Sequence, residues 1–89
     1  MSDKWLEQTK AASHIRDLLH PRKLELPSRK MTLPDNQEWI VFQHKQRQIG
    51  IDIASGVWVR ESDQDNWKCL AMPCTVSGAL QAVEFLTQE

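Results

Sequence analysis

The chain contains few of the residues that mark a specialised class of protein. Its 89 residues include two cysteines, three glycines and no tyrosine, and eleven Lys and Arg stand against twelve Asp and Glu. Two cysteines are too few for the disulfide framework of a small secreted scaffold. The glycines are isolated from one another, at Gly50, Gly56 and Gly78, which excludes a standard glycine-rich phosphate loop. The net charge of −1 gives no long-range attraction to nucleic acid or anionic lipid.

Long hydrophobic segments are also missing. No apolar run approaches the roughly 20 residues that cross a bilayer, and residues 1–5 lack the apolar stretch of a secretory leader. We therefore expect a cytoplasmic protein with no membrane partner and with reduced thiols, buried or half-buried, at Cys69 and Cys74.

No pattern of residues predicts a catalytic or metal site. Cys69 and Cys74 do not have the close paired spacing of a structural zinc site. Each histidine has an ordinary interpretation, His14 on the polar side of a helix, His20 at its end and His44 in a loop, and no nucleophile stands in a local signature with a base. We predict that the protein is not an enzyme and has no catalytic residue, metal site or cofactor. A site assembled from scattered residues is the alternative.

The residues that are present suit a single domain over residues 1–89. Hydrophobic residues make up 40% of the chain and charged residues 26%, which is ordinary globular usage. Four tryptophans supply large side chains for a core. A chain of this length supports only one core.

Helices are predicted at about residues 2–19 and 75–87. Ser2 and Thr75 are suited to cap them, and Pro21 ends the first, because a residue before proline avoids the α region. Apolar residues recur at helical spacing in both segments. In the first they are Trp5, Ala12, Ile15, Leu18 and Leu19, and in the second Val76, Ala79, Leu80, Val83 and Leu86.

Four strands are predicted between the helices, at about residues 38–43, 48–54, 57–62 and 67–71. The first is a continuous apolar run that begins at Trp39. In the second, Ile49, Ile51 and Ile53 alternate with other residues, which is the pattern of a half-buried strand. The segment before them, about residues 20–37, contains three prolines and several basic residues and is predicted to be a loop with at most a short extended piece.

Polarity predicts how the second and third strands pair. A three-residue loop that ends in Gly56, with Gly56 at positive φ, keeps charged and apolar residues on separate faces. It pairs Ile53 with Val57, and Ile51 with Val59. The face opposite the isoleucines then carries Asp52, Trp58 and Arg60. A four-residue turn at 63–66 sets Leu70 against Val59 and adds to that face Trp67, Cys69 and Ala71.

The predicted fold class is α+β, with an N-terminal helix, a four-stranded antiparallel β-meander, and a C-terminal helix packed on the isoleucine face. The sequence leaves open whether the first helix covers the other face and buries Trp58 and Trp67.

The first functional hypothesis is a small non-enzymatic module that binds another protein. Tryptophan and arginine are enriched where interfaces concentrate their binding energy. The predicted partner-binding residues are Trp58, Arg60, Trp67 and Lys68. If the first helix packs on this face, both tryptophans are core residues instead. A homodimer is another way to cover a hydrophobic sheet face in a small protein.

The alternative hypothesis is a nucleic-acid-binding module. The middle of the chain carries an excess of positive charge, and a loop folded near a turn would form a phosphate-binding strip, beside an exposed tryptophan that stacks on bases. The residues of that strip are Arg22, Lys23, Arg29, Lys30, Lys45 and Arg47.

Overall fold

The computed structural model describes residues 3–24, 26–72 and 74–88, and side chains from Gln8 onward within these ranges. The predicted cap at Ser2 and the side chain of Trp5 lie outside the described residues.

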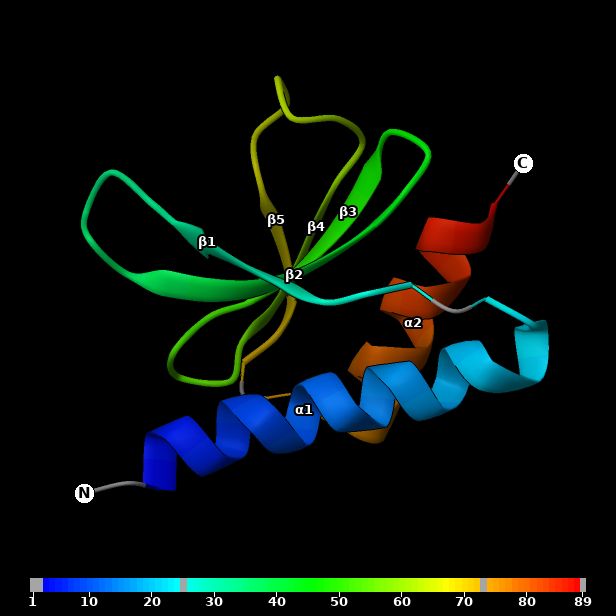
Figure 1. Cartoon of the computed structure of the whole chain (residues 1–89), viewed down its shortest axis with the longest axis horizontal. Coiled ribbons are helices and arrows are strands. Elements are labelled where there is room, and N and C mark those ends of the chain that lie inside the picture. Colours follow the sequence, from blue (N-terminus) through cyan, green and yellow to red (C-terminus); the bar gives the residue numbers. More distant parts are fainter. Residues whose placement is uncertain (1–2, 25, 73, 89) are drawn as a thin grey trace.

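Two helices and a five-stranded sheet make up the described fold (Figure 1). In chain order the elements are α1 (Asp3–Leu19), the 3-10 turn η1 (His20–Arg22), β1 (Arg29–Thr32), β2 (Glu38–His44), β3 (Arg47–Ile51), β4 (Val57–Arg60), β5 (Lys68–Ala71) and α2 (Val76–Thr87). The strands lie in the order β1-β2-β3-β4-β5, and each pairs antiparallel with the next. The α+β class and the two helices agree with the sequence prediction.

The prediction of four strands is wrong by one, because β1 lies inside the segment predicted to be a loop. Arg29 pairs with Val41 and Met31 with Trp39. The turn that joins β1 to β2 is closed by the Leu33 amide, which donates to the Gln37 carbonyl over 2.9 Å. Within the described part of the chain, β1 pairs with β2 alone, and its side chains are mostly exposed. Such a strand does not need alternating apolar residues, so the sequence gives no periodic sign of it.

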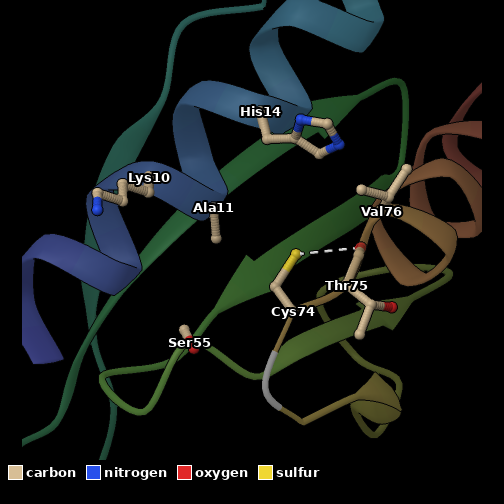
Figure 2. Close-up of a pocket in the computed structure, with 7 residues that line it drawn as sticks. All are labelled: Lys10, Ala11, His14, Ser55, Cys74, Thr75 and Val76. Atoms are coloured by element: carbon tan, nitrogen blue, oxygen red, sulfur yellow. Dashed lines mark hydrogen bonds between the residues drawn. The ribbon is translucent and has the colours of Figure 1, made fainter.

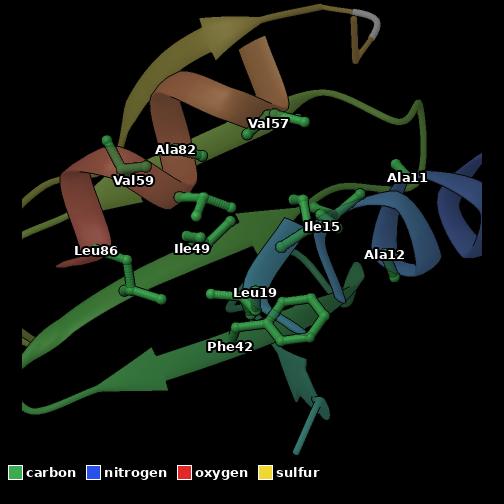
Figure 3. Close-up of a cluster of buried hydrophobic side chains, with 13 residues drawn as sticks. Ala11, Ala12, Ile15, Leu19, Phe42, Ile49, Val57, Val59, Ala82 and Leu86 are labelled. Carbon is green, nitrogen blue, oxygen red and sulfur yellow. The ribbon is translucent and has the colours of Figure 1, made fainter. Parts of the chain in front are cut away.

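Both helices pack on the same face of the sheet, the isoleucine face (Figure 1). Figure 3 shows Ile15 and Leu19 of α1 beside the buried side chains of Phe42 and Ile49. The buried part of α2 completes this core with Ala79, Ala82, Val83 and Leu86. On α1, the buried amide of Gln8 donates to the carbonyls of Glu38 and Ile51, over 3.1 and 3.0 Å. These bonds fix the helix across the ends of two strands.

The β3–β4 hairpin differs from its prediction by two residues. Ile51 pairs with Val57 and Ile49 with Val59, so β3 ends at Ile51 and a five-residue loop, 52–56, follows. Ser55, not Gly56, takes the positive φ, at 62°. Ile53 is therefore a loop residue, 46% exposed, and not a core residue. Because side chains alternate with a period of two, this shift leaves the residues of β3 and β4 on their predicted faces.

The β4–β5 pairing contains a β-bulge that the prediction lacks. Lys68 lies opposite Val59 and Cys69 opposite Trp58, but Ala71 lies opposite Val57, so that β5 has one extra residue. The predicted pairing of Leu70 with Val59 is therefore wrong. Ala71 packs against α2 instead of the Trp58 face, since a Cβ placed on Gly78 would lie 2.5 Å from its Cβ.

Candidate functional site: a tryptophan and arginine sheet face

The sheet face opposite the helices is here called the open face, because both described helices pack on the other one. Strand alternation and the observed register assign residues of all five strands to it. Its members are Arg29, Met31, Trp39, Val41, Gln43, Gln48, Gly50, Trp58, Arg60, Trp67 and Cys69. The sequence left open whether the first helix covers Trp58 and Trp67. Among the described residues, α1 packs on the opposite face and does not cover them.

Three tryptophans gather on the open face. The Trp39 ring lies between the other two, with centroids 5.6 Å from Trp58 and 5.2 Å from Trp67. Gly50 makes this possible, since a Cβ there would lie 2.7 Å from Trp39 Cε3 and 3.1 Å from Trp67 Cη2. Trp39 is only 6% exposed, whereas Trp58 and Trp67 are half-buried. Trp39 therefore supports the cluster, and the other two present its surface.

The Asp52 carboxylate holds Trp58 in place. One oxygen, Oδ1, accepts from the backbone N–H groups of Ala54 and Gly56, over 2.9 and 2.7 Å. The other, Oδ2, accepts from Trp58 Nε1 over 2.8 Å. A Cβ on Gly56 would lie 2.7 Å from that oxygen, so glycine is required here by close approach and not by positive φ. The indole is thus fixed through a carboxylate that is itself buried.

A row of polar side chains crosses the open face from β1 to β4. Arg29 Nη2 and Gln48 Nε2 both donate to Gln43 Oε1, over 2.9 and 3.2 Å. Arg60 Nε donates to Gln48 Oε1 over 2.5 Å. Arg60 also places its guanidinium carbon 4.3 Å from the centroid of the Trp67 ring, a cation–π contact. The row therefore joins the two arginines to the tryptophan cluster.

Burial of the Arg60 guanidinium lowers its pKa from the ordinary value. The nearby carboxylates of Asp63 and Asp65 act in the opposite direction, while the charge of Arg29 lowers the pKa further. An arginine remains protonated under all these influences. The open face consequently carries two cations close enough to influence each other.

Three of the four residues predicted to bind a partner meet on the open face, namely Trp58, Arg60 and Trp67. Lys68 does not join them. It lies opposite Val59, whose side chain faces the helices, and lines a hollow beside Phe85 of α2. The physical reason is strand alternation, because neighbours in a strand point to opposite faces.

The six cations predicted to form a phosphate-binding strip are spread over the molecule. Arg29 lies on the open face, and Lys30 points to the opposite side of β1. Arg47 donates to the carbonyls of Phe85 and Gln88 at the end of α2. Three lie elsewhere, as Arg22 bonds to the Leu18 carbonyl, Lys23 ends η1, and Lys45 occupies the β2–β3 turn.

Sequence reasoning did not assign Trp39 and Arg29 to the site. β2 is apolar on both faces at its centre, so alternation does not reveal that Trp39 and Gln43 share the face of Trp58. Arg29 could be placed only by recognising β1. The turn at Pro34-Asp35-Asn36 was an available indication, because a tight turn before one strand implies an antiparallel strand on its other side.

Other classes of site were sought among the described residues. Within them, no group of three or more His, Cys, Asp and Glu side chains is placed to hold a metal ion. Both cysteines are free thiols; Cys69 is exposed, against expectation, because it falls on the open face of an edge strand. None of the described helices combines the length and apolar character that a membrane span requires.

Comparison of the chain with models of protein families, with curated proteins and with solved structures finds no match. The functional argument therefore rests on the geometry of the chain itself.

Proposed function

We propose that the protein is a non-enzymatic binding module that contacts another protein through its open face. The observation that carries this proposal is the meeting of Trp58, Trp67 and Arg60 on the sheet face opposite both helices. Tryptophan and arginine contribute large contact area and directional hydrogen bonds, and they dominate the energetic centres of protein interfaces. Here both residue types are held in place before any partner arrives, which lowers the entropy cost of binding.

The chemistry of the face indicates the kind of surface it would bind. Trp58 and Trp67 offer apolar area, and Arg29 and Arg60 add two positive charges. Nε of Arg60 donates to Gln48, so the two terminal nitrogens of Arg60 are the groups that would donate to both oxygens of a carboxylate. A partner segment that carries Asp or Glu beside apolar side chains fits this arrangement.

The test is quantitative capture with the immobilised full chain and its variants Trp58→Ala, Trp67→Ala and Lys68→Ala. Lys68→Ala is the matched control, since Lys68 is exposed but faces the helix side. We expect a defined set of proteins retained by the native chain and by the control, and reduced at least about tenfold by both tryptophan variants, as for hot-spot residues. Equal retention by all four chains would refute the proposal.

Pairing of two copies through the open face would cover the tryptophans but bring the arginines of both copies together, and sedimentation equilibrium of the purified chain tests this case directly. If the face pairs with itself, the native chain and Lys68→Ala are dimeric and Trp67→Ala is monomeric.

Nucleic acid is the second candidate, and the specific observation in its favour is Arg29 near Arg60 beside the aromatic cluster. Single strands bind through cations along the backbone and aromatic rings against the bases. Asp63 and Asp65 argue against nucleic acid, because their negative charges near Arg60 would repel a phosphate group. Tryptophan fluorescence during addition of oligo(dT) decides between the two. A saturable change at low salt that disappears at high salt would favour the nucleic acid.

A further inference from the structure

A pocket of about 370 Å³ lies between α1, the β3–β4 loop and the start of α2, but its polar groups do not converge (Figure 2). The Lys10 ammonium is directed away from the His14 imidazole. The Cys74 thiol donates to the Thr75 carbonyl, with 3.6 Å between sulfur and oxygen. The outer edge of β1 differs from this pocket, because its polar groups follow the regular order of a strand.

The hydrogen bonds of the β1–β2 turn show which backbone groups of β1 point away from β2. Leu33 donates to the Gln37 carbonyl over 2.9 Å and accepts from the Asn36 amide over 2.8 Å, so both of its backbone groups face β2. Along an antiparallel strand, residues whose backbone groups face the neighbouring strand alternate with residues whose groups do not. The N–H and C=O groups of Lys30 and Thr32 therefore point outward.

These outward groups offer hydrogen bonds to another strand. Lys30 and Thr32 present two N–H donors and two C=O acceptors, and none of the four has a hydrogen-bond partner among the described residues. The side chains of both residues are exposed. An extended polypeptide can both donate to and accept from such an edge. Phosphate oxygens only accept, and the two carbonyls would repel them, so the edge favours a peptide over a nucleic acid.

The side chains of β1 indicate the charge of the segment that fits this edge. Arg29 and Lys30 are exposed cations on opposite faces of the strand, and β1 contains no Asp or Glu. Arg29 donates to Gln43 through Nη2 and retains its other terminal nitrogen for a carboxylate. A segment with two adjacent carboxylates would place one on each face, opposite a cation. Two copies of β1 would instead bring four cations together, which disfavours a dimer through this edge.

We propose that the outer edge of β1 binds an extended acidic segment of a partner protein as a sixth strand. Backbone hydrogen bonds to Lys30 and Thr32 supply the pairing, and carboxylates opposite Arg29 and Lys30 select an acidic segment. The proposal goes beyond the use of the open face, because these contacts are made without Trp58 and Trp67. A negative result at one of the two surfaces therefore leaves the other unaffected.

The probe for the test is the hexapeptide acetyl-TVEEVT-amide, with acetyl-TVKKVT-amide as the control of opposite charge. Both sequences read the same in either direction, so they can pair parallel or antiparallel. Backbone amide NMR of the full chain follows each addition. We expect TVEEVT to cause saturable shifts that are larger at the amides of Lys30 and Thr32 than at those of Arg29 and Met31, and to bind at least about tenfold more tightly than TVKKVT. No saturable shift at the Lys30 and Thr32 amides, or equal affinity for the two peptides, would overturn the proposal.

Two variants of Thr32 test the backbone contact. Thr32→Pro removes one outward N–H but no hydrogen bond to β2, and proline is tolerated where the N–H of an edge strand faces solvent. Thr32→Val is the matched control, since it keeps the N–H. We expect Thr32→Pro to weaken TVEEVT about fivefold and Thr32→Val to leave its affinity unchanged. Equal affinities for the two variants would mean that the peptide does not pair with β1.

The charge contact is tested separately by Arg29→Gln and Lys30→Gln, each of which removes one cation. Each is expected to weaken TVEEVT about threefold or more, whereas Lys10→Gln, at an exposed lysine of α1, is the control with no effect. If neither variant weakened TVEEVT more than Lys10→Gln does, the carboxylate contacts would be wrong. The amide spectrum itself reports whether each variant is folded.

Discussion

The carboxylate of Asp52 stabilises the loop between β3 and β4 and orients Trp58 as well. It accepts three hydrogen bonds from N–H groups and is 6% exposed. In Asp52→Asn, one oxygen can still accept from the backbone, but the new amide group meets the Trp58 N–H, and two donors then face each other. We expect the free energy of unfolding to fall by about 1.5–3 kcal/mol, measured by urea denaturation.

The matched control for Asp52→Asn is Asp63→Asn, which makes the same chemical change at an exposed turn residue. Its effect is expected to stay within about 0.5 kcal/mol. If the two variants had the same stability, Asp52 would not stabilise the loop in the way its hydrogen bonds indicate.

At the scale of elements, the contact between α2 and β5 depends on a glycine. Alanine is the better helix former by about 1 kcal/mol in a helix interior, so propensity alone predicts that Gly78→Ala stabilises α2. A Cβ at that position, however, would lie 2.5 Å from Cβ of Ala71. We therefore expect Gly78→Ala to lower the free energy of unfolding by about 1–3 kcal/mol, the usual cost of overpacking.

The double variant Ala71→Gly/Gly78→Ala tests this cause. Removing the methyl group of Ala71 gives the new Cβ room, so the cost of Gly78→Ala should shrink in the Ala71→Gly background. Costs that simply added, as measured in a double-mutant cycle of denaturation experiments, would contradict the close contact between α2 and β5.

The elements that the sequence predicted well are those that contact the core. Ile15, Leu19, Ile49 and Ile51 are fully or almost fully buried, and hydrophobic periodicity reports burial directly. β1 was missed because its side chains are mostly exposed. The hairpin loop was predicted two residues too short, because polarity separates the faces equally well in registers that differ by two.

The candidate site was predicted in part, because the regular alternation of strand side chains can be read from the sequence. Trp58, Arg60 and Trp67 were placed together because strand alternation survives a two-residue shift. His14 was assigned to the polar side of α1, yet its Nε2 is buried. α1 packs against α2 as well as against the sheet. The second contact makes the buried face of α1 wider, so that it includes Ala11 and part of His14 in addition to Ala12 and Ile15. Such widening depends on the position of α2, which periodicity in α1 does not report.

In the whole molecule, one face of the sheet forms the core with the helices, and the opposite face is the open face. Ile49 is fully buried between the helices and the sheet, and Ile49→Ala is expected to lower the free energy of unfolding by about 2–5 kcal/mol. Trp67 is half-buried on the open face, so Trp67→Ala should cost clearly less, although it removes a larger side chain. Thermal or urea unfolding of both variants measures the difference. A larger loss for Trp67→Ala would mean that the open face is a second core and not a binding surface.

The consecutive order of the five strands has a consequence for how the chain folds. Each strand finds its neighbour through a short connection, so the sheet can grow hairpin by hairpin with little loss of loop entropy. α1 is the exception, because it packs against α2 as well as the sheet, and α2 is the last element along the chain. On a translating ribosome α1 would therefore emerge before α2, and the docking of α1 against α2 could follow only once the strands and α2 had also been made.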